Sequence, residues 1–220
     1  MHHVNKSFAE SKGVVQILVD IDLTVRIRES LAIIGSSGCG KTTLLYILGG
    51  LDTPDSGTVQ FRGTELSQLD WNAKSRLRNE QIGFVFQFHH LLTEFTALEN
   101  VALPAMIKGE ERRNALRQAY KALERTGLTR QADQPVSTLS GGERQLTSIA
   151  RAISLGPEVI LADEPTGDLD QESGEMVAEL LVQLNRDTGK TLIVVTHNQN
   201  LARQMGRVLQ ISSGAIHETT

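Results

Sequence analysis

The fold is decided by a glycine-rich stretch near the N-terminus, Gly35-Ser36-Ser37-Gly38-Cys39-Gly40-Lys41-Thr42, which Thr43 continues. It fits the pattern G-x-x-x-x-G-K-[ST] of a phosphate-binding loop. Glycines let the backbone N–H groups turn inward around phosphate oxygens, and the helix that follows adds its positive N-terminal end. We expect this phosphate loop (residues 35–43) to bind a nucleoside triphosphate, with Lys41 at the β- and γ-phosphates and the Thr42 hydroxyl on Mg²⁺.

The segment before the loop has the character that the pattern requires. Leu31-Ala32-Ile33-Ile34 is a short continuous apolar run, typical of a fully buried strand. Four fixed positions arise by chance in roughly one chain of this length in a hundred. An ordinary glycine-rich turn is therefore a poor explanation, and the sequence predicts an α/β fold of the P-loop NTPase type.

Apolar patterns outline the remaining elements. Alternating apolar residues from Ile17 to Ile27 predict a half-buried antiparallel strand region, and further strands are predicted over 58–61, 82–86, 159–162 and 191–196. A capping-box pattern at Thr96 and Glu99 opens one helix, and another is predicted over 171–187. A third helix is predicted over 110–125, with one side made of Leu116, Ala119, Tyr120 and Leu123. The prediction is a single domain over 1–220, with a parallel-sheet core, an N-terminal antiparallel β part and an inserted helical subdomain over 88–155.

Composition excludes several classes of protein. The chain has 220 residues, 40% of them hydrophobic, which suits one domain with an insertion. The net charge of −4 and the lack of a basic run argue against a nucleic-acid binder. The single cysteine, Cys39, excludes an internal disulfide framework and fits a reducing compartment. Neither a signal peptide nor a membrane helix is expected, so any membrane must be supplied by other subunits.

Two adjacent acids follow a predicted strand and complement the phosphate loop. Asp163 and Glu164 come directly after the apolar run 159–162. We expect Asp163 to hold Mg²⁺, directly or through water, and Glu164 to polarise the water that attacks the γ-phosphorus. An N-cap pair before the next helix is the alternative. Pro165 and Thr166 follow without an immediate helix, which favours the catalytic pair.

The segment Leu139-Ser140-Gly141-Gly142-Glu143 separates this chain from other P-loop proteins. It resembles the LSGGQ/E signature of ABC transporter ATP-binding subunits. The Ser140 hydroxyl and the N–H groups of Gly141 and Gly142 would form a second anion cradle at a helix N-terminus. A merely capped helix is the alternative for a pentapeptide alone. Together with the phosphate loop and the carboxylate strand, this signature segment (residues 139–143) favours the ABC interpretation.

The resemblance implies roles for further residues in this sequence. Gln87 matches the glutamine that senses Mg²⁺ and the attacking water, and His197 matches the histidine that contacts the γ-phosphate. Asp168 and Asp170 lie in a segment that resembles the D-loop, which crosses between subunits. Phe8 is the candidate for stacking on adenine, with a packing role in a short strand as the alternative. The resemblance implies ATP and Mg²⁺ as cofactors and a homodimer that sandwiches two nucleotides.

The segment after Gln87 narrows the resemblance. Phe86-Gln87-Phe88-His89-His90-Leu91-Leu92 looks like the ATPase subunit of lipoprotein-releasing (Lol) exporters. That family implies a peripheral location on the cytoplasmic face of the bacterial inner membrane, beneath integral permease subunits. The candidate groove for those subunits consists of His89, His90, Leu91, Leu92 and Phe95. A local apolar cluster that packs the insertion is the alternative for these residues.

Other functions stay open at this point. Macrolide- or peptide-efflux and cell-division ATPases share much of the same pattern. Soluble ABC proteins of DNA repair or translation usually carry two cassettes or a long coiled-coil insertion, and neither is present here. A regulator without turnover is disfavoured by Glu164, Gln87 and His197. The sequence also departs from the family at Leu146, where many relatives have arginine, and at Arg28, where glycine is common.

Overall fold

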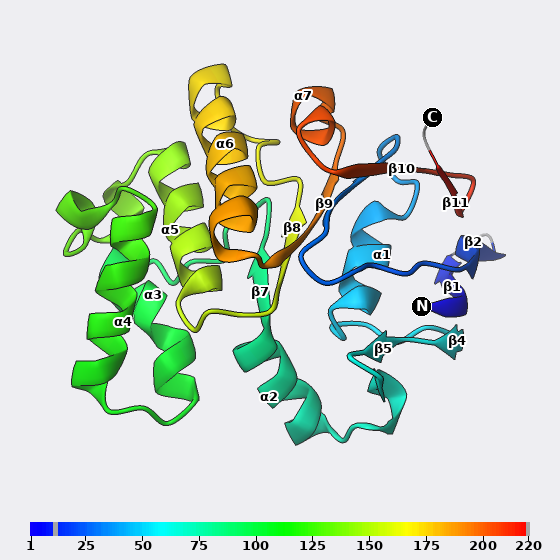
Figure 1. Ribbon diagram of the computed structural model, residues 1–220, viewed down its shortest axis with the longest axis horizontal. Coiled ribbons are helices and arrows are strands. Elements are labelled where there is room, and N and C mark those ends of the chain that lie inside the picture. The colour runs from blue at the N-terminus through cyan, green and yellow to red at the C-terminus, as the bar shows by residue number, and fades with distance from the viewer. Residues whose placement is uncertain (11–12, 219–220) are drawn as a thin grey trace.

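A six-stranded sheet forms the centre of the computed structural model, which describes residues 1–10 and 13–218. The strand order is β11-β10-β3-β9-β8-β7 (Figure 1). The strands are β3 (Ser30–Ile34), β7 (Ile82–Val85), β8 (Val159–Asp163), β9 (Thr191–Thr196), β10 (Arg207–Ser212) and β11 (Ala215–Glu218). All neighbours pair in parallel except the edge hairpin of β10 and β11. The carboxyl ends of β3, β8 and β9 therefore lie at one edge, where ligands bind in open α/β sheets.

Helices cover both faces of this sheet. Successive side chains of a strand point to opposite faces, so in β3 Leu31 and Ile33 pack with α1 (Lys41–Leu48) on one side. Ala32 lies in the cluster on the other side, which includes side chains of the remaining core helices. These are α5 (Gly141–Ile153), α6 (Gln171–Thr188) and α7 (Gln199–Arg203). The phosphate loop and the signature segment thus lead into helices on opposite faces of the sheet.

A group of helices extends the molecule beyond β7 (Figure 1). It contains α3 (Ala97–Ile107), α4 (Arg112–Arg125) and α5, and α2 (Trp71–Gln81) precedes β7. Alanines allow α4 to approach its neighbours closely, since Ala115, Ala119 and Ala122 are buried. The predicted apolar side of this helix was wrong in one respect: Tyr120 is 48% exposed. The buried side of α4 consists instead of Ala115, Ala119, Ala122 and Leu123.

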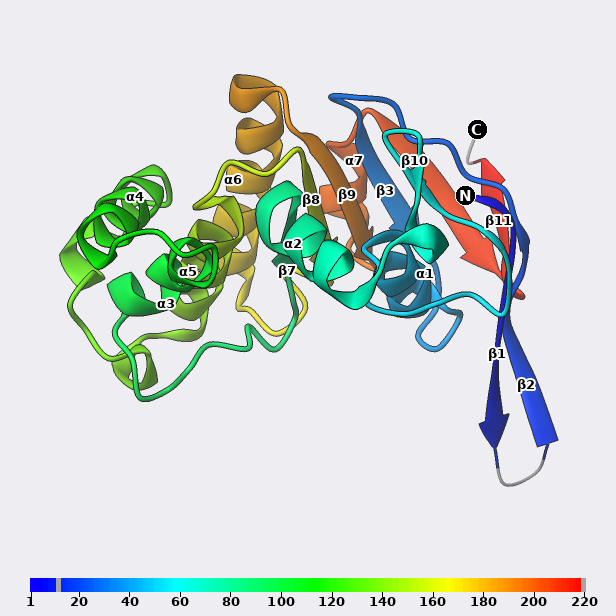
Figure 2. The same cartoon turned by 90° about the horizontal axis from the view of Figure 1, so that it is seen from below.

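A separate three-stranded sheet has the order β2-β1-β4. Its strands are β1 (His2–Glu10), β2 (Gly13–Ile21) and β4 (Ser56–Thr58), and the β1–β2 hairpin projects from the body (Figure 2). The predicted strand over 17–27 was wrong beyond Ile21. The β1–β2 register shifts around Lys6, and Asp20 has a left-handed φ of 49°. These irregularities change the face that the side chains of β2 occupy, so Leu18 is buried while Val19 is 37% exposed. Ile27 lies beyond the strand and is 76% exposed.

Other element boundaries differ modestly from expectation. The predicted strand 58–61 is divided between β4 and β5 (Gln60–Phe61), and β5 pairs with β6 (Thr64–Glu65). Short 3-10 helices cover Leu66–Gln68, Thr129–Gln131 and Val136–Thr138. The predicted capping box at Thr96 and Glu99 is confirmed. Within the described ranges, no helix combines the length and apolar character that a membrane crossing needs.

Candidate nucleotide-binding site

The phosphate loop is held in a conformation that depends on glycine. Gly40 has a φ of 101°, and a Cβ at this position would lie 2.8 Å from Ile17 Cγ2. Any other residue would be strained in this left-handed region and would collide with β2. The loop is therefore pressed against the N-terminal hairpin, and its last turn leads directly into α1.

Lys41 places its ammonium group within the loop. The side chain is only 7% exposed, and Nζ donates to the carbonyl oxygens of Gly35 at 3.0 Å and Ser36 at 3.1 Å. Glu164 Oε1 lies 3.5 Å from the same nitrogen. A buried cation beside a helix N-terminus is a strong attraction for the phosphates of a nucleotide.

The next residue joins the loop to the carboxyl end of β8. Thr42 Oγ1 donates to Asp163 Oδ1 at 3.0 Å. Burial raises the pKa of the Asp163 carboxyl, and the hydrogen bond from Thr42 opposes that shift. A hydroxyl and a carboxylate are the oxygen ligands that Mg²⁺ prefers. The side chains at this point therefore fit a magnesium ion.

Glu164 has an unusual backbone and several partners. Its φ is 43°, a left-handed conformation that is uncommon for a non-glycine residue. Its N–H donates to Val195 O at 2.9 Å. Its Oε2 accepts the backbone N–H of His197 at 3.0 Å and lies 3.0 Å from His197 Nδ1. The strained turn aims the carboxylate at Lys41 and His197, so the structure brings these three predicted site residues together.

Gln87 meets the segment after Glu164. Its Nε2 donates to Asp168 Oδ1 at 3.0 Å and lies 3.3 Å from where a Cβ of Gly167 would be. Among the described residues, Gln87 makes no hydrogen bond to Thr42 or Asp163, with which it was expected to share Mg²⁺. Asp170 has a local partner as well, because it caps α6 by accepting from Ser173 N at 3.0 Å. The two D-loop acids therefore make contacts within the chain.

The signature segment forms a capped helix start. Ser140 Oγ accepts the N–H of Glu143 at 3.2 Å, and Glu143 Oε2 accepts the N–H of Ser140 at 2.8 Å. Gln131 Nε2 donates to the other carboxylate oxygen at 3.0 Å, a contact that no sequence motif indicated. The Ser140 backbone bond is the main reason that the pKa of Glu143 is lowered. Glu143 is therefore engaged in the cap, and Ser140, Gly141 and Gly142 remain as the candidate cradle.

Gly142 is required where two helices meet. A Cβ on Gly142 would lie 2.9 Å from Ser173 Oγ, whereas one on Gly141 would be 3.7 Å from Leu169 Cδ2. Ser173 is itself held by Asp170, since its Oγ donates to Asp170 Oδ2 at 2.7 Å. The missing side chain therefore lets α5 start beside α6 and the D-loop.

The phosphate loop and the signature segment do not meet within one chain. Their helices, α1 and α5, pack on opposite faces of the sheet (Figure 1). Over residues 1–10 and 13–218, no hydrogen bond or ion pair joins residues 35–43 to residues 139–143. The two candidate phosphate cradles are therefore separate features of one chain.

Phe8 lies on the projecting hairpin. It is 43% exposed, and Lys6 Nζ lies 5.1 Å from its ring centroid. Lys6 pairs with Leu18 across the hairpin, and Leu18 is one of the residues that a Cβ on Gly40 would meet. Phe8 therefore belongs to the strand that borders the phosphate loop, with its ring accessible for stacking.

The residues after Gln87 differ in accessibility. Leu91 packs against the core, whereas Leu92 and Phe95 are 44% and 37% exposed. Phe88, which was not among the candidates, is 72% exposed. Asn100 fixes the segment from α3 by accepting Leu92 N at 2.8 Å and donating to Leu92 O at 3.0 Å. The segment is an ordered surface with apolar side chains that face outward.

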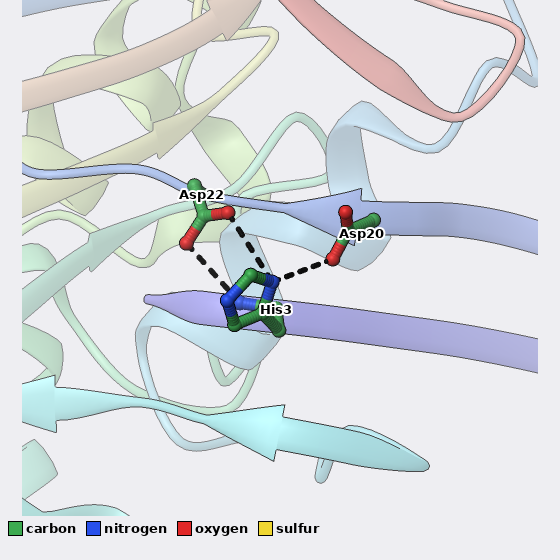
Figure 3. Close-up of side chains that lie close together, drawn as sticks. All are labelled: His3, Asp20 and Asp22. Atoms are coloured by element: carbon green, nitrogen blue, oxygen red, sulfur yellow. Dashed lines mark hydrogen bonds and ion pairs between the residues drawn. The ribbon is translucent and has the colours of Figure 1, made fainter.

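One cluster outside this site has side chains that could ligate a metal. One ligand atom from each of His3, Asp20 and Asp22 lies within 4.8 Å of the other two (Figure 3). His3 is on β1, Asp20 is on β2 and Asp22 follows the end of β2. His3 Nδ1 lies 2.8 Å from Asp20 Oδ1 and 3.5 Å from Asp22 Oδ2. The hydrogen bond with Asp20 and the nearby negative charges raise the pKa of His3. The imidazolium is thus favoured here, and it would compete with a cation for the two exposed carboxylates.

Comparison with known proteins agrees with the geometry of the site. The sequence profile described as ABC transporter matches residues 18–167. The chain is 50% identical over 202 residues to the lipoprotein-releasing system ATP-binding protein LolD of Nitratidesulfovibrio vulgaris, covering 92% of this chain and 87% of that protein. It is 47% identical over 215 residues to the protein of the same name from Oleidesulfovibrio alaskensis, with coverages of 98% and 93%.

Solved structures agree with this grouping. The dimeric structure of MJ0796, a bacterial ABC transporter cassette, has a TM-score of 0.91 and 37% identity, covering 99% of this chain and 95% of that one. A post-hydrolysis dimer of the same cassette, bound to ADP and Pi, also has a TM-score of 0.91, with 36% identity and coverages of 99% and 97%. The predicted fold class and ATPase activity are confirmed. The chain belongs to the ABC transporter family of ATPases.

Proposed function

We propose that this chain is the ATP-hydrolysing subunit of a membrane complex that releases lipoproteins from the bacterial inner membrane. The proposal is supported by relatives named as lipoprotein-releasing system ATP-binding proteins, which match nearly the whole chain. The ordered segment after Gln87, with its Phe-His-His-Leu-Leu sequence and exposed apolar side chains, supports the same assignment.

The residues at the carboxyl edge of the sheet have distinct roles in hydrolysis. The phosphate loop binds the phosphates of ATP, and Lys41 neutralises the β- and γ-phosphates. Thr42, Asp163 and Gln87 would hold Mg²⁺, and the ion would supply charge neutralisation on the phosphate oxygens. Glu164 orients the attacking water and accepts its proton, while His197 holds the carboxylate in place through two contacts. Phe8 stacks on the adenine ring.

One observation carries the assembly proposed for this site: Ser140 and the phosphate loop lie apart in the chain. The N-terminus of α5 can bind an anion, but the phosphate loop of the same chain does not bring a nucleotide to it. The nucleotide would therefore come from a second chain. In a two-fold homodimer, the signature segment of each subunit closes on the ATP of the other. Asp168 and Asp170 then lie near the subunit boundary.

Membrane subunits bind the surface after Gln87. His89, His90, Leu91, Leu92 and Phe95 form the proposed groove, and Phe88 adds an exposed aromatic ring to it. Aromatic side chains at an exposed, ordered position are typical anchors of protein interfaces. The chain thereby sits peripherally on the cytoplasmic face of the membrane.

The experiment is purification of a tagged chain from native membranes, followed by identification of its bound subunits and an assay of lipoprotein release in proteoliposomes. Release that depends on ATP and on the copurified subunits is the expected result. A partner that exports macrolides or peptides, or one that acts in cell division, would contradict the lipoprotein proposal. Phe88→Asp is expected to abolish copurification, whereas Val14→Asp, at a 75% exposed position on the hairpin, is the matched control.

A further inference from the structure

The turn after Gln87 has a backbone that needs support. His89 and His90 are both left-handed, with φ values of 56° and 48°. Two consecutive non-glycine residues in this region are unfavourable and persist only where surrounding contacts hold them. Within the turn, His89 N donates to Phe86 O at 3.2 Å and His90 N donates to Phe88 O at 2.5 Å.

Arg151 supplies the contact from outside the turn. Its Nη2 donates to His89 O at 2.6 Å, and its Nη1 donates to His90 O at 2.7 Å. Burial lowers the pKa of Arg151 to about 10, so the guanidinium is still charged at neutral pH. In the part of the chain that the structure describes, no carboxylate forms an ion pair with it. The partly buried guanidinium of Arg151 thus donates one hydrogen bond from each terminal nitrogen to the carbonyl oxygens of His89 and His90.

Arg151 lies near the end of the helix that begins at the signature segment. Ser140 caps the start of α5, and Arg151 is in the last turn of that helix. The two positions are eleven residues apart along the helix, a rise of about 16 Å. A helix of this length is stiff, so a displacement of the turn can be passed to the Ser140 end without any contact between them.

We propose that Arg151 is a positioning residue that fixes the turn after Gln87 to α5, so that the surface after Gln87 and the Ser140 cradle move as one unit. This inference rests on the proposed function only for the roles of Gln87 and Ser140. Its structural part, the support of two left-handed residues by one guanidinium, stands independently of that function.

Arginine is needed for this role because both carbonyls must be satisfied at once. A lysine in place of Arg151 would offer a single point charge and could bond one carbonyl well. Glutamine at this position keeps one amide donor group, but it lacks the positive charge and the second donor nitrogen of the guanidinium. The expected order of effect is therefore Arg151→Gln larger than Arg151→Lys.

The first experiment is amide hydrogen exchange of the full chain, followed at residues 88–92. Arg151→Gln is expected to speed exchange of the His89 and His90 amides roughly tenfold, the change that corresponds to loss of a charge-assisted hydrogen bond. Arg151→Lys should fall between that variant and the parent. Arg117→Gln is the matched control, since the Arg117 guanidinium donates to Asn114 within α4 and lies on another helix. Unchanged exchange in Arg151→Gln would overturn the proposal.

The second experiment separates positioning from general stability. In steady-state ATP hydrolysis, Arg151→Gln is expected to lower kcat about tenfold and to leave KM within about twofold, because the phosphate loop does not contact Arg151. Replacing His89 and His90 with asparagine in that variant should restore part of both kcat and exchange protection, since asparagine enters the left-handed region more readily. If KM rose by the same factor as kcat fell, or if the asparagines restored neither kcat nor exchange protection, Arg151 would have a merely structural role.

The two experiments fail in different ways. If the parent chain lacked ATP turnover, the proposed function would be wrong, yet the exchange result would still test the Arg151 contact. If turnover were normal and exchange insensitive to Arg151, the contact would be wrong and the function would stand.

Discussion

The carboxyl edge of the sheet and the N-terminus of α5 both present groups suited to phosphate, yet they are built differently. At the sheet edge, Thr42 contacts Asp163, and Glu164 contacts both Lys41 and His197. Lys41 and Asp163 are also buried there. At the helix start, Ser140 is exposed and its cap is closed by Glu143. In the first region, the side chains contact one another within a single chain. The second region is an exposed helix start whose contacts are those of its own cap.

This difference explains why the two regions depend on different interactions. The sheet edge brings together the phosphate loop, β8 and β9, so its geometry is fixed by the core. The helix start depends on local caps and on the fit of Gly142 against Ser173. Substitutions at the sheet edge should therefore act on chemistry within each subunit, whereas those at the helix start should act on stability and on pairing.

The largest effect is expected at Glu164. Glu164→Gln removes the proton acceptor while keeping the shape of the side chain, so hydrolysis should fall about 10²- to 10⁴-fold. ATP binding should persist, and a dimer should accumulate with ATP on gel filtration. Glu175→Gln, on the exposed part of α6, is the control with parental turnover. If Glu164→Gln hydrolysed ATP at the parental rate, the assignment of Glu164 as the proton acceptor at the sheet edge would be wrong.

The next effect concerns the fit of the helix start. Gly142→Val inserts a branched side chain against Ser173 and should lower the free energy of unfolding by about 1–3 kcal/mol. Gly141→Val is the matched control, because a Cβ there is at an ordinary contact distance from Leu169. Thermal unfolding of both variants measures the difference. Equal stability of the two would contradict the packing assigned to Gly142, and Ser173→Gly should partly rescue Gly142→Val.

Two similar capping boxes allow stability to be separated from activity. Glu143→Ala removes the cap of α5 and should destabilise the chain by about 1 kcal/mol at neutral pH. The pKa of Glu143 is lowered from 4.5 in the fold, so its stabilisation is present above pH 4.5 and is lost as the pH falls through the folded-state pKa. Denaturant unfolding from pH 7 to pH 3 checks this loss.

The capping box of α3 is the control for that variant. The pKa of Glu99 is lowered by its own cap, so Glu99→Ala should show a similar pH dependence of stability. Only Glu143→Ala should also lower ATP turnover, because only that box supports the Ser140 cradle. Equal turnover in the two variants would show that the α5 cap has no functional role.

The smallest effect is expected at the hairpin. Phe8→Ala should weaken ATP binding about 2- to 12-fold, the range for loss of one aromatic stacking contact. Phe8→Trp should keep the affinity, and Val14→Ala is the exposed control on β2. Fluorescent-nucleotide titration measures all three. An affinity that is unchanged by Phe8→Ala would leave Phe8 as a packing residue.

Local sequence patterns predicted the parts of the structure that local physics controls. The glycine spacing before Lys41 indicated the phosphate loop, and the Thr96–Glu99 pair indicated a capped helix start. The signature segment was expected at a helix N-terminus, and α5 begins there. Apolar runs located β3, β8 and β9. The predicted acid pair then came directly at the end of β8, where the sheet places Asp163 beside Thr42.

Contacts between distant segments could not be predicted in the same way. The strand expected up to Ile27 ends at Ile21. Within it, the extra residues of β2 opposite Val4–Ser7 alter which side chains face inward, and simple alternation in the sequence does not indicate them. Arg151 lies 61 residues beyond His90 in sequence, and no periodic pattern connects them. Gln87 was expected beside the metal ligands, and its bond to Asp168 depends on the path of the loop after Glu164.

The central claim, that a complete site needs two chains, is tested most directly by mixing two inactive variants. Lys41→Ala disables the phosphate loop and Ser140→Arg disables the cradle, so neither variant alone should hydrolyse ATP. Random pairing of the two gives about half mixed dimers, each with one intact site of two, so activity should return to about one quarter of the parental value. Activity that stays at the sum of the two separate variants would contradict the shared site.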